Sequence, residues 1–269
     1  MRVAFQVMGV TAGRKDSNCE ILLKEALLAC REQGAEVRMI NLKDYELLDC
    51  NGCTACTMGM SMGKNTGCSL ADKDDKQKIM DVMLEQDAVI FSAPTYDLMP
   101  SSLFLKFMHR NLAYESAFLT KIGAIAPRDR VGALIAVGGS TRSWQSMALE
   151  CMQATTFTNS FKIVDMYMAT QVPAPAQVLL YEEKVAQARE MGLNVMKALN
   201  TPPAERKWLG DPDYGWCPNL PLQRPVPGRA PVEGATVPHR VRGVRRGRHP
   251  GADRGRALEI RHRREWAGA

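Results

Sequence analysis

The 269-residue sequence predicts an α/β protein with a doubly wound, five-stranded parallel sheet and helices on both faces. Two observations predict this fold class. Apolar runs of strand length alternate with amphipathic segments of helical length over residues 1–200. The central runs are apolar throughout, as expected for parallel strands covered on both faces. Such an alternation requires right-handed crossovers between parallel strands.

The predicted elements follow one another in a regular order. Residues 2–10 form the first strand, and residues 20–33 form a helix that Gly34 ends. The second strand covers residues 36–42. The remaining elements are a helix at 75–86, a strand at 87–92, a helix at 103–110, strands at 130–137 and 162–168, and a closing helix at 181–199.

Three polar loops follow predicted strands, at residues 11–19, 94–101 and 138–144. In a doubly wound sheet, ligands bind outside the carboxyl ends of the strands near the switch point. The first loop places hydroxyls, backbone N–H groups and a basic side chain at a helix N-terminus, which suits a phosphate. Taken alone, that loop is equally consistent with an ordinary Ser or Asn helix cap. The convergence of three loops favours the phosphate site.

Four of the eight cysteines form a C-x2-C-x2-C-x11-C pattern at Cys50, Cys53, Cys56 and Cys68. They alternate with Gly, Asn, Thr and Ser, so a role as small buried residues is the least favoured interpretation. Ligation of zinc or of an iron-sulfur cluster is favoured, and a redox-active thiol pair is the alternative. His109 is the only histidine before residue 220, so hydrolase chemistry is not expected and we assign no catalytic residue.

The composition limits the compartment and the partners. A hydrophobic content of 45% is enough for a sizeable core. The sequence enters an apolar strand directly and contains no long apolar stretch, so we expect no signal peptide and no membrane span. Without export, the cysteines are expected to be reduced thiols or metal ligands in a cytoplasmic protein.

The C-terminal residues differ from the rest in charge. The net charge is +6, yet twelve arginines and only four acidic residues follow Asn219. Residues 201–269 lack any helical or strand period, and we predict an extended, disordered tail. Read one nucleotide out of register, the tail permits a CP-x-x-CHC knuckle that begins at Cys217. We favour a frameshifted remnant of a zinc ribbon over a genuine basic arm, and we do not expect nucleic-acid binding.

The loops also carry a family resemblance. Three segments, Arg14-Lys15-Asp16-Ser17-Asn18, Ser92-Ala93-Pro94-Thr95-Tyr96 and Gly138-Gly139-Ser140, together resemble the NADPH-dependent FMN reductase branch of the flavodoxin-like proteins. The cysteine segment, followed by the acidic pair Asp74-Asp75, resembles that of the iron-sulfur flavoproteins. The gap before Cys68 is longer than is usual in that family, and we expect the inserted residues 58–67 to be flexible.

The resemblance implies FMN as cofactor, NAD(P)H as co-substrate, and a set of site residues. The implied phosphate-binding residues are Thr11, Arg14, Ser17, Asn18 and Cys19. The implied isoalloxazine contacts are Pro94, Thr95, Tyr96 and Asp97 on one edge and Gly138, Gly139 and Ser140 on the other. Cys50, Cys53, Cys56 and Cys68 are the implied ligands of a 4Fe-4S cluster.

These observations favour an FMN-dependent NAD(P)H oxidoreductase in which electrons pass between the nicotinamide, the flavin and the cluster. We expect a homo-oligomer, a dimer or tetramer, that reduces a small redox partner or a small-molecule acceptor. Two alternatives remain open. One is a zinc-binding or regulatory flavodoxin-like protein, and the other is a flavin quinone reductase whose cysteines are redox thiols.

Overall fold

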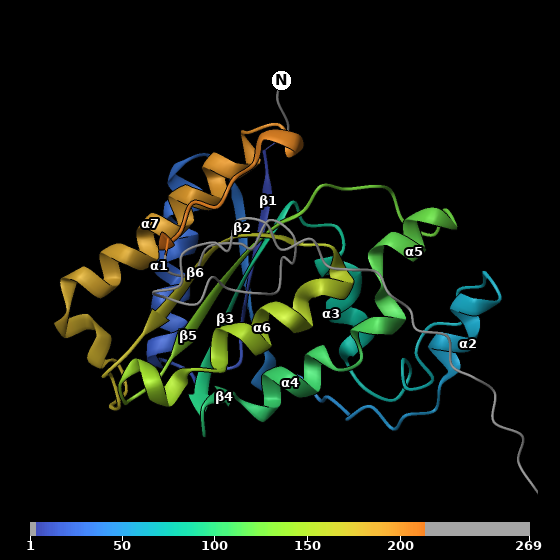
Figure 1. Ribbon diagram of the computed structural model, residues 1–269, viewed down its shortest axis with the longest axis horizontal. Helices are drawn as coiled ribbons and strands as arrows, with labels where there is room; N and C mark the ends of the chain where they lie inside the picture. The colour runs from blue at the N-terminus through green and yellow to red at the C-terminus, as the bar shows by residue number, and fades with distance from the viewer. Residues whose placement is uncertain (1–3, 213–269) are drawn as a thin grey trace, which may run out of the picture. The chain divides into compact units, whose positions relative to one another are not determined.

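A computed structural model of the protein describes residues 4–212 (Figure 1). Five parallel strands form a sheet in the order β2-β1-β3-β5-β6. The strands are β1 (Gln6–Thr11), β2 (Glu36–Asn41), β3 (Ala88–Tyr96), β5 (Val131–Val137) and β6 (Lys162–Ala169). The chain passes from β1 to one side and then returns across β1 to β3, which places the switch point between β1 and β3. The predicted doubly wound sheet is confirmed.

Helices cover both faces of this sheet. Figure 1 shows α1 (Asn18–Glu32) and α7 (Glu182–Leu199) on one face. The other face carries α3 (Lys76–Met83), α4 (Ser102–Met108) and α6 (Ala148–Thr156). Neighbouring strand residues divide between the two apolar clusters: Ile90 packs on the side of α1 and α7, and Phe91 on the opposite side. Because both faces are covered, the central strands are apolar throughout.

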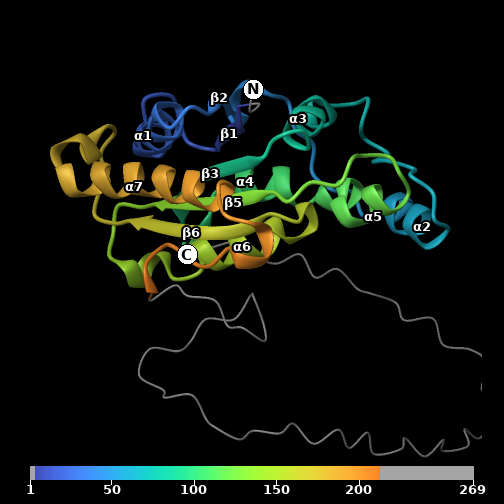
Figure 2. The ribbon, with the colours of Figure 1, turned by 90° about the horizontal axis from the view of Figure 1, so that it is seen from above.

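Two short helices lie apart from these layers. They are α2 (Ala55–Ser61), which lies inside the cysteine segment, and α5 (Ser116–Lys121). In both views α2 and α5 lie at the same end of the domain, away from α1 and α7 (Figures 1 and 2). Single 3-10 turns occur at Leu42–Asp44, Asn111–Tyr114, Arg142–Gln145, Phe157–Asn159, Gln177–Leu180 and Pro203–Glu205.

The third strand is longer than predicted. We expected it to end at Ser92, but β3 continues to Tyr96 and pairs antiparallel with the two-residue strand β4 (Met99–Pro100). The turn between them consists of Asp97 and Leu98, which both have positive φ, 45° and 72°. Two-residue hairpin turns favour this backbone because its twist matches that of the strands. The sequence lacks the usual glycine there, so it gave no hairpin signal.

The chain continues to contact the domain after α7. The backbone N–H of Leu209 donates a hydrogen bond to the carbonyl of Val164 at 2.8 Å, which places this segment beside the edge strand β6. The rest of the predicted tail, including Cys217 and the frameshift interpretation, lies outside the described residues, so the boundary at residue 200 stays a prediction. None of the helices within residues 4–212 has the length and apolar character needed to cross a membrane.

Candidate functional site

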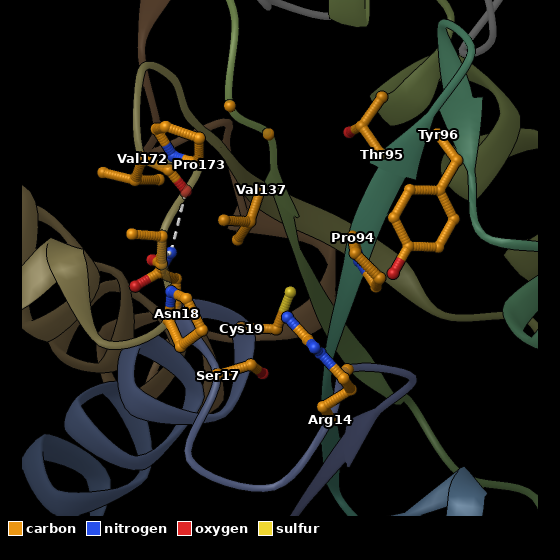
Figure 3. Close-up of a pocket in the computed structure, with 15 residues that line it drawn as sticks. Arg14, Ser17, Asn18, Cys19, Pro94, Thr95, Tyr96, Val137, Val172 and Pro173 are labelled. Carbon is orange, nitrogen blue, oxygen red and sulfur yellow. Dashed lines mark hydrogen bonds between the residues drawn. The ribbon is translucent and has the colours of Figure 1, made fainter.

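A pocket of about 120 Å³ lies at the carboxyl edge of the sheet (Figure 3). The parallel register brings the ends of β1, β3 and β5 together there: Thr11 pairs with Ser92, and Pro94 pairs with Val137. Most of the predicted flavin contacts line the pocket, namely Arg14, Ser17, Asn18, Cys19, Pro94, Thr95, Tyr96, Gly138 and Gly139. Thr11, Asp97 and Ser140 are not among the lining residues.

The first loop is held rigidly by the N-terminus of α1. The Ser17 hydroxyl accepts a hydrogen bond from the backbone N–H of Glu20 at 3.4 Å, and the Glu20 carboxylate accepts one from the N–H of Asp16 at 2.8 Å. This is close to a capping box, in which the side chains of the cap and of the third helical residue each accept a hydrogen bond from the other's backbone N–H, except that Glu20 accepts from Asp16, one residue before the cap. Ser17 therefore caps the helix and also lines the pocket. The first-turn N–H groups, which have no intrahelical acceptor, and the Arg14 side chain beside Cys19 make this wall electropositive (Figure 3).

Asn18 has a structural role that the sequence did not reveal. Its side-chain amide donates to the carbonyls of Val172 and Ala174 at 2.8 and 2.9 Å, and its oxygen accepts from the N–H of Val178 at 3.0 Å. All of its side-chain groups thus tie the loop after β6 to α1 (Figure 3). The side-chain polar groups of Asn18 are thus engaged within the protein, and its implied role in phosphate binding stays a prediction.

Cys19 is buried where the resemblance implies a phosphate contact. The Ser92 hydroxyl donates to the Cys19 carbonyl at 2.9 Å, which joins the start of α1 to β3. Burial raises the pKa of the Cys19 thiol to about 12, so the thiol is protonated at neutral pH. A neutral thiol adds no negative charge beside an anion.

The far wall of the pocket comes from a segment that the sequence analysis did not assign. Residues 172–175 follow β6 and line the pocket opposite Pro94. A Cβ on Gly139 would lie 2.8 Å from the Cβ of Pro173, and one on Gly138 would lie 2.5 Å from the Cδ of Gln145. Gly139 is needed because the Pro173 backbone approaches it closely, whereas at Gly138 the close neighbour is the amide of the Gln145 side chain. The topology itself was the missed signal, since the end of β6 must lie at this same edge.

The four predicted metal ligands surround a second cavity. Its volume is about 190 Å³, and Cys50, Cys53, Cys56 and Cys68 all line it, together with Arg110 and the exposed His109. The Ser69 hydroxyl lies 2.9 Å from the Cys53 sulfur and lowers the pKa of that thiol. The sequence prediction that the four cysteines lie together is therefore consistent with the geometry, and their ligand role stays a prediction.

The inserted residues are more regular than expected. We predicted a flexible insertion at 58–67, but α2 extends through its first four residues. The Thr66 hydroxyl then donates to the carbonyl of Ala55 at 2.9 Å, and the N–H of Lys64 donates to the carbonyl of Gly59 at 2.8 Å. The insertion thus folds back on α2, which returns the chain toward Cys56 before it reaches Cys68.

A buried ion pair lies behind the cysteine cavity. The Arg110 guanidinium, after α4, donates to the carboxylate of Asp74, before α3, and the two side chains are 1% and 0% exposed. Burial alone would raise the pKa of Asp74, but hydrogen bonds from Arg110 and from the Leu48 N–H hold it below its ordinary value. Arg110 Nε and Nη2 lie 3.4 and 3.3 Å from the Cys68 sulfur. Neither contact was predicted.

A second buried basic side chain, Lys76, lies close by. The Lys76 side chain is fully buried, donates to the carbonyl of Phe107 and to Asn111 Oδ1, and lies 4.3 Å from the Phe107 ring centroid. Burial lowers the pKa of Lys76 well below its ordinary value, and Arg110 lowers it further, whereas Cys68, Asp74 and Cys50 act in the opposite direction. Burial and Arg110 thus disfavour the ammonium form of Lys76, and negative charge on Cys68, Asp74 or Cys50 favours it.

The arrangement of the thiols bears on which metal group they would fit. A single zinc requires four sulfurs about 2.3 Å from one centre, and hence about 3.8 Å from one another. Within residues 4–212, no three Cys, His, Asp or Glu side chains are placed to hold one ion. The four thiols line one cavity instead, and a cluster, in which each thiolate would bind a different iron, would not require them to meet at one centre.

Comparisons with known proteins identify the family of this chain. Residues 7–173 match the family model of NADPH-dependent FMN reductases. An iron-sulfur flavoprotein of Methanocaldococcus jannaschii is 31% identical over 147 residues, which cover 54% of this chain and 68% of that protein. One of Methanosarcina thermophila is 26% identical over 148 residues, 54% of this chain and 70% of that protein.

A solved structure of a flavone reductase superposes with a TM-score of 0.62. The superposition covers 80% of this chain and 69% of that chain at 22% identity, and it shows the shared flavodoxin-like fold. The family model spans more than half of the sequence and all of the residues that line the pocket except Ala174 and Pro175. The chain therefore belongs to the NADPH-dependent FMN reductase family of flavin oxidoreductases.

Proposed function

We propose that the protein is an iron-sulfur flavoprotein that takes electrons from NAD(P)H through FMN and passes them to a 4Fe-4S cluster on Cys50, Cys53, Cys56 and Cys68. The observation that carries this proposal is the cavity of about 190 Å³ that all four cysteines line. The folded insertion returns Cys68 to the cavity that the other three cysteines line, so the four thiols can act as one ligand set. The two relatives named as iron-sulfur flavoproteins add support.

The pocket at the sheet edge would hold FMN by its phosphate. Arg14 and the first-turn N–H groups of α1 supply positive charge, and Ser17 supplies a hydroxyl at the same end. Pro94, Thr95 and Tyr96 would bound the ring system on one side. Thr95 is held in place because its hydroxyl donates to Gln145 Oε1 at 3.2 Å. When bound, FMN supplies hydride chemistry and the cluster supplies one-electron transfer.

Several features of the chain would serve the cluster. The folded insertion brings Cys68 within reach, so the closure entropy of the longer loop is small. Arg110 places positive charge behind the cavity, with Nη2 3.3 Å from the Cys68 sulfur, which suits a group that carries net negative charge with its four thiolates.

The surface beside the flavin pocket supports the predicted homo-oligomer. The Tyr96 and Trp144 side chains are 60% and 65% exposed, although both are large and aromatic. Met147 joins the two segments, since its N–H donates to the carbonyl of Leu98 at 3.2 Å. A second copy of the chain covering this apolar surface would remove it from water. Light scattering of the purified protein tests this expectation, and a monomer at micromolar concentration would contradict it.

Anaerobic purification followed by analysis of iron, acid-labile sulfide, zinc and FMN tests the proposed function. We expect about four iron and four sulfide atoms per chain for one cluster, with one FMN. Zinc without sulfide would replace the proposal by the zinc-binding alternative. Neither metal, with FMN present, would leave the redox-thiol quinone reductase.

A pair of cysteine variants makes the assignment specific. Cys68→Ala should lose or remodel the cluster and retain FMN, so flavin reduction by NAD(P)H continues while one-electron transfer fails. Cys151→Ala is the matched control, because Cys151 is half-buried in α6 and does not line the cavity. If Cys68→Ala kept full iron and sulfide and the EPR signal of the reduced protein, a different fourth ligand would have to replace it.

A further inference from the structure

The Asp74–Arg110 pair holds both ends of the cysteine segment. At the first end, the N–H of Leu48 donates to Asp74 Oδ2 at 2.8 Å, and the Leu48 carbonyl accepts from Arg110 Nη1 at 3.2 Å. At the other end, Arg110 contacts the Cys68 sulfur through two nitrogens. One guanidinium therefore reaches the backbone two residues before Cys50 and the side chain of Cys68.

The remaining cysteines are held in a different way. Cys53 is fixed locally, because its N–H donates to Asn51 Oδ1 at 3.2 Å and its sulfur contacts the Ser69 hydroxyl. Cys56 lies on α2. Only Cys68 has its sulfur in contact with a buried cation in the described part of the chain. Asp74 fixes the orientation of that cation, and its other oxygen accepts from the N–H of Lys76 at 3.3 Å.

We propose that Arg110 is a positioning residue for the cluster: its two N–H groups hold the Cys68 thiolate in place and raise the cluster's reduction potential. The inference rests on the proposed function, because it presupposes a redox cluster on these cysteines. Hydrogen bonds to a ligand sulfur are among the terms that set cluster potentials. One-electron reduction adds one negative charge next to the guanidinium, so the guanidinium stabilises the reduced form more than the oxidised form.

The geometry explains why lysine would not replace this arginine. The guanidinium fork contacts Cys68, Leu48 and Asp74 simultaneously, and an ammonium offers a point charge without that fixed fork. Arg110→Lys should therefore keep the charge and lose the directional contacts to sulfur. Removing the charge alone would leave Asp74 buried without its partner, so we pair Arg110→Gln with Asp74→Asn.

The experiment is an EPR-monitored redox titration of the full-length protein, purified anaerobically and titrated with dithionite. In the Asp74→Asn/Arg110→Gln variant we expect at least a tenfold loss of preference for the reduced form. For one electron, this is a fall of about 59 mV in midpoint potential. Arg110→Lys should recover part of that shift. FMN content should match the wild type in both variants, since the flavin pocket shares no residue with the pair.

Arg130→Lys is the matched control. Arg130 is also a buried arginine, but it donates to the carbonyl of Leu84 and lies just before β5, outside the cysteine cavity. Its variant should show the wild-type potential and iron content. A shift of the same size in Arg130→Lys would mean that any disturbed buried arginine moves the potential, and the inference would be overturned.

The outcomes separate the two proposals. A wild-type protein without iron and sulfide overturns the proposed function and this inference together. A wild-type protein with a full cluster, and a double variant with full iron and an unshifted potential, overturns this inference alone. Loss of FMN together with iron in both Arg110 variants would show that the fold itself depends on the Asp74–Arg110 pair. That result would also overturn the positioning role.

Discussion

The flavin pocket and the cysteine cavity are built in opposite ways. The pocket is formed by the ends of parallel strands and the N-terminus of α1, so the sheet register fixes its walls. The cysteine segment lies between β2 and α3 with only the short helix α2, and its deepest anchor is the Asp74–Arg110 pair. A site on regular elements is fixed by many backbone hydrogen bonds, whereas the loop depends on a few buried side chains.

Asn18 is the flavin pocket's counterpart of Arg110, and changing it should give the largest effect on stability. Asn18→Ala removes three hydrogen bonds, two buried and one part-buried, and leaves their partners unpaired, which should cost about 3 to 4 kcal/mol in unfolding free energy. Urea unfolding with and without excess FMN measures it. If the Asn18 side chain ties the loop after β6 to α1, the variant should lose stability both with and without FMN. A loss seen only with FMN would instead make the side chain a phosphate ligand.

The two anchors also show what the sequence can and cannot predict. The apolar runs of β1, β3 and β5 predict the sheet, and the sheet predicts where Arg14, Ser17 and the two glycines converge. The partners of Asn18 lie 154 to 160 residues away, and those of Arg110 lie 36 to 62 residues away. No local pattern encodes such pairings, because they exist only after the layers have packed.

Two buried carboxylates extend the comparison. Asp74 has a guanidinium partner, whereas Asp165 on β6 accepts hydrogen bonds from Asn194 and lies near Glu190 and Asp211. Burial raises the pKa of Asp165 to about 6 from 3.8. The folded state then binds this proton more tightly than the unfolded state does. Protonated Asp165 therefore contributes to the free energy of unfolding, and this contribution is fully present below the unfolded pKa. It is lost as the pH rises through about 6.

Asp165→Asn should therefore raise the free energy of unfolding at pH 7 and leave it unchanged under acidic conditions. The cost of ionising Asp165 reaches about 3 kcal/mol at pH 7, which is an upper limit for the gain. Urea midpoints of both proteins at pH 4 and pH 7.5 give the difference in stability between variant and wild type at each pH. Subtracting the wild-type value removes the pH dependence that comes from the other carboxylates. A variant that is less stable than wild type at pH 7.5 would show that the carboxylate is stabilising when ionised.

Arg14 tests whether the two sites are independent. Arg14→Ala should weaken FMN binding by about 2 kcal/mol, roughly thirtyfold, because it removes one charged hydrogen bond to phosphate. Iron and sulfide content should not change. Lys15→Ala is the control, since Lys15 is adjacent, exposed and absent from the pocket lining. Fluorescence titration of the flavin measures affinity, and equal effects of the two variants would reduce Arg14 to general electrostatic attraction.

Backbone strain occurs in both regions and should give the smallest effects. Leu98, in the hairpin turn beside the flavin pocket, has φ of 72°, and Thr54, just before α2, has φ of 59°. A side chain in the left-handed region costs of order 1 kcal/mol or more, which glycine avoids. Leu98→Gly also gains freedom in the unfolded chain and loses some packing, so the net change should be within about 1 kcal/mol of zero.

The comparison that isolates the strain is glycine against alanine at the same position. Leu98→Ala loses the same side-chain packing but keeps the unfavourable φ, so Leu98→Gly should be more stable than Leu98→Ala by about 0.5 to 1 kcal/mol. The same pair at Thr54 should give the same sign, because the left-handed backbone rather than the side chain sets the difference. Thermal unfolding of the four variants measures both differences. If the alanine variant were more stable than the glycine variant at position 98 but not at position 54, the hairpin turn would carry no backbone strain. Strain would then be confined to the cysteine segment.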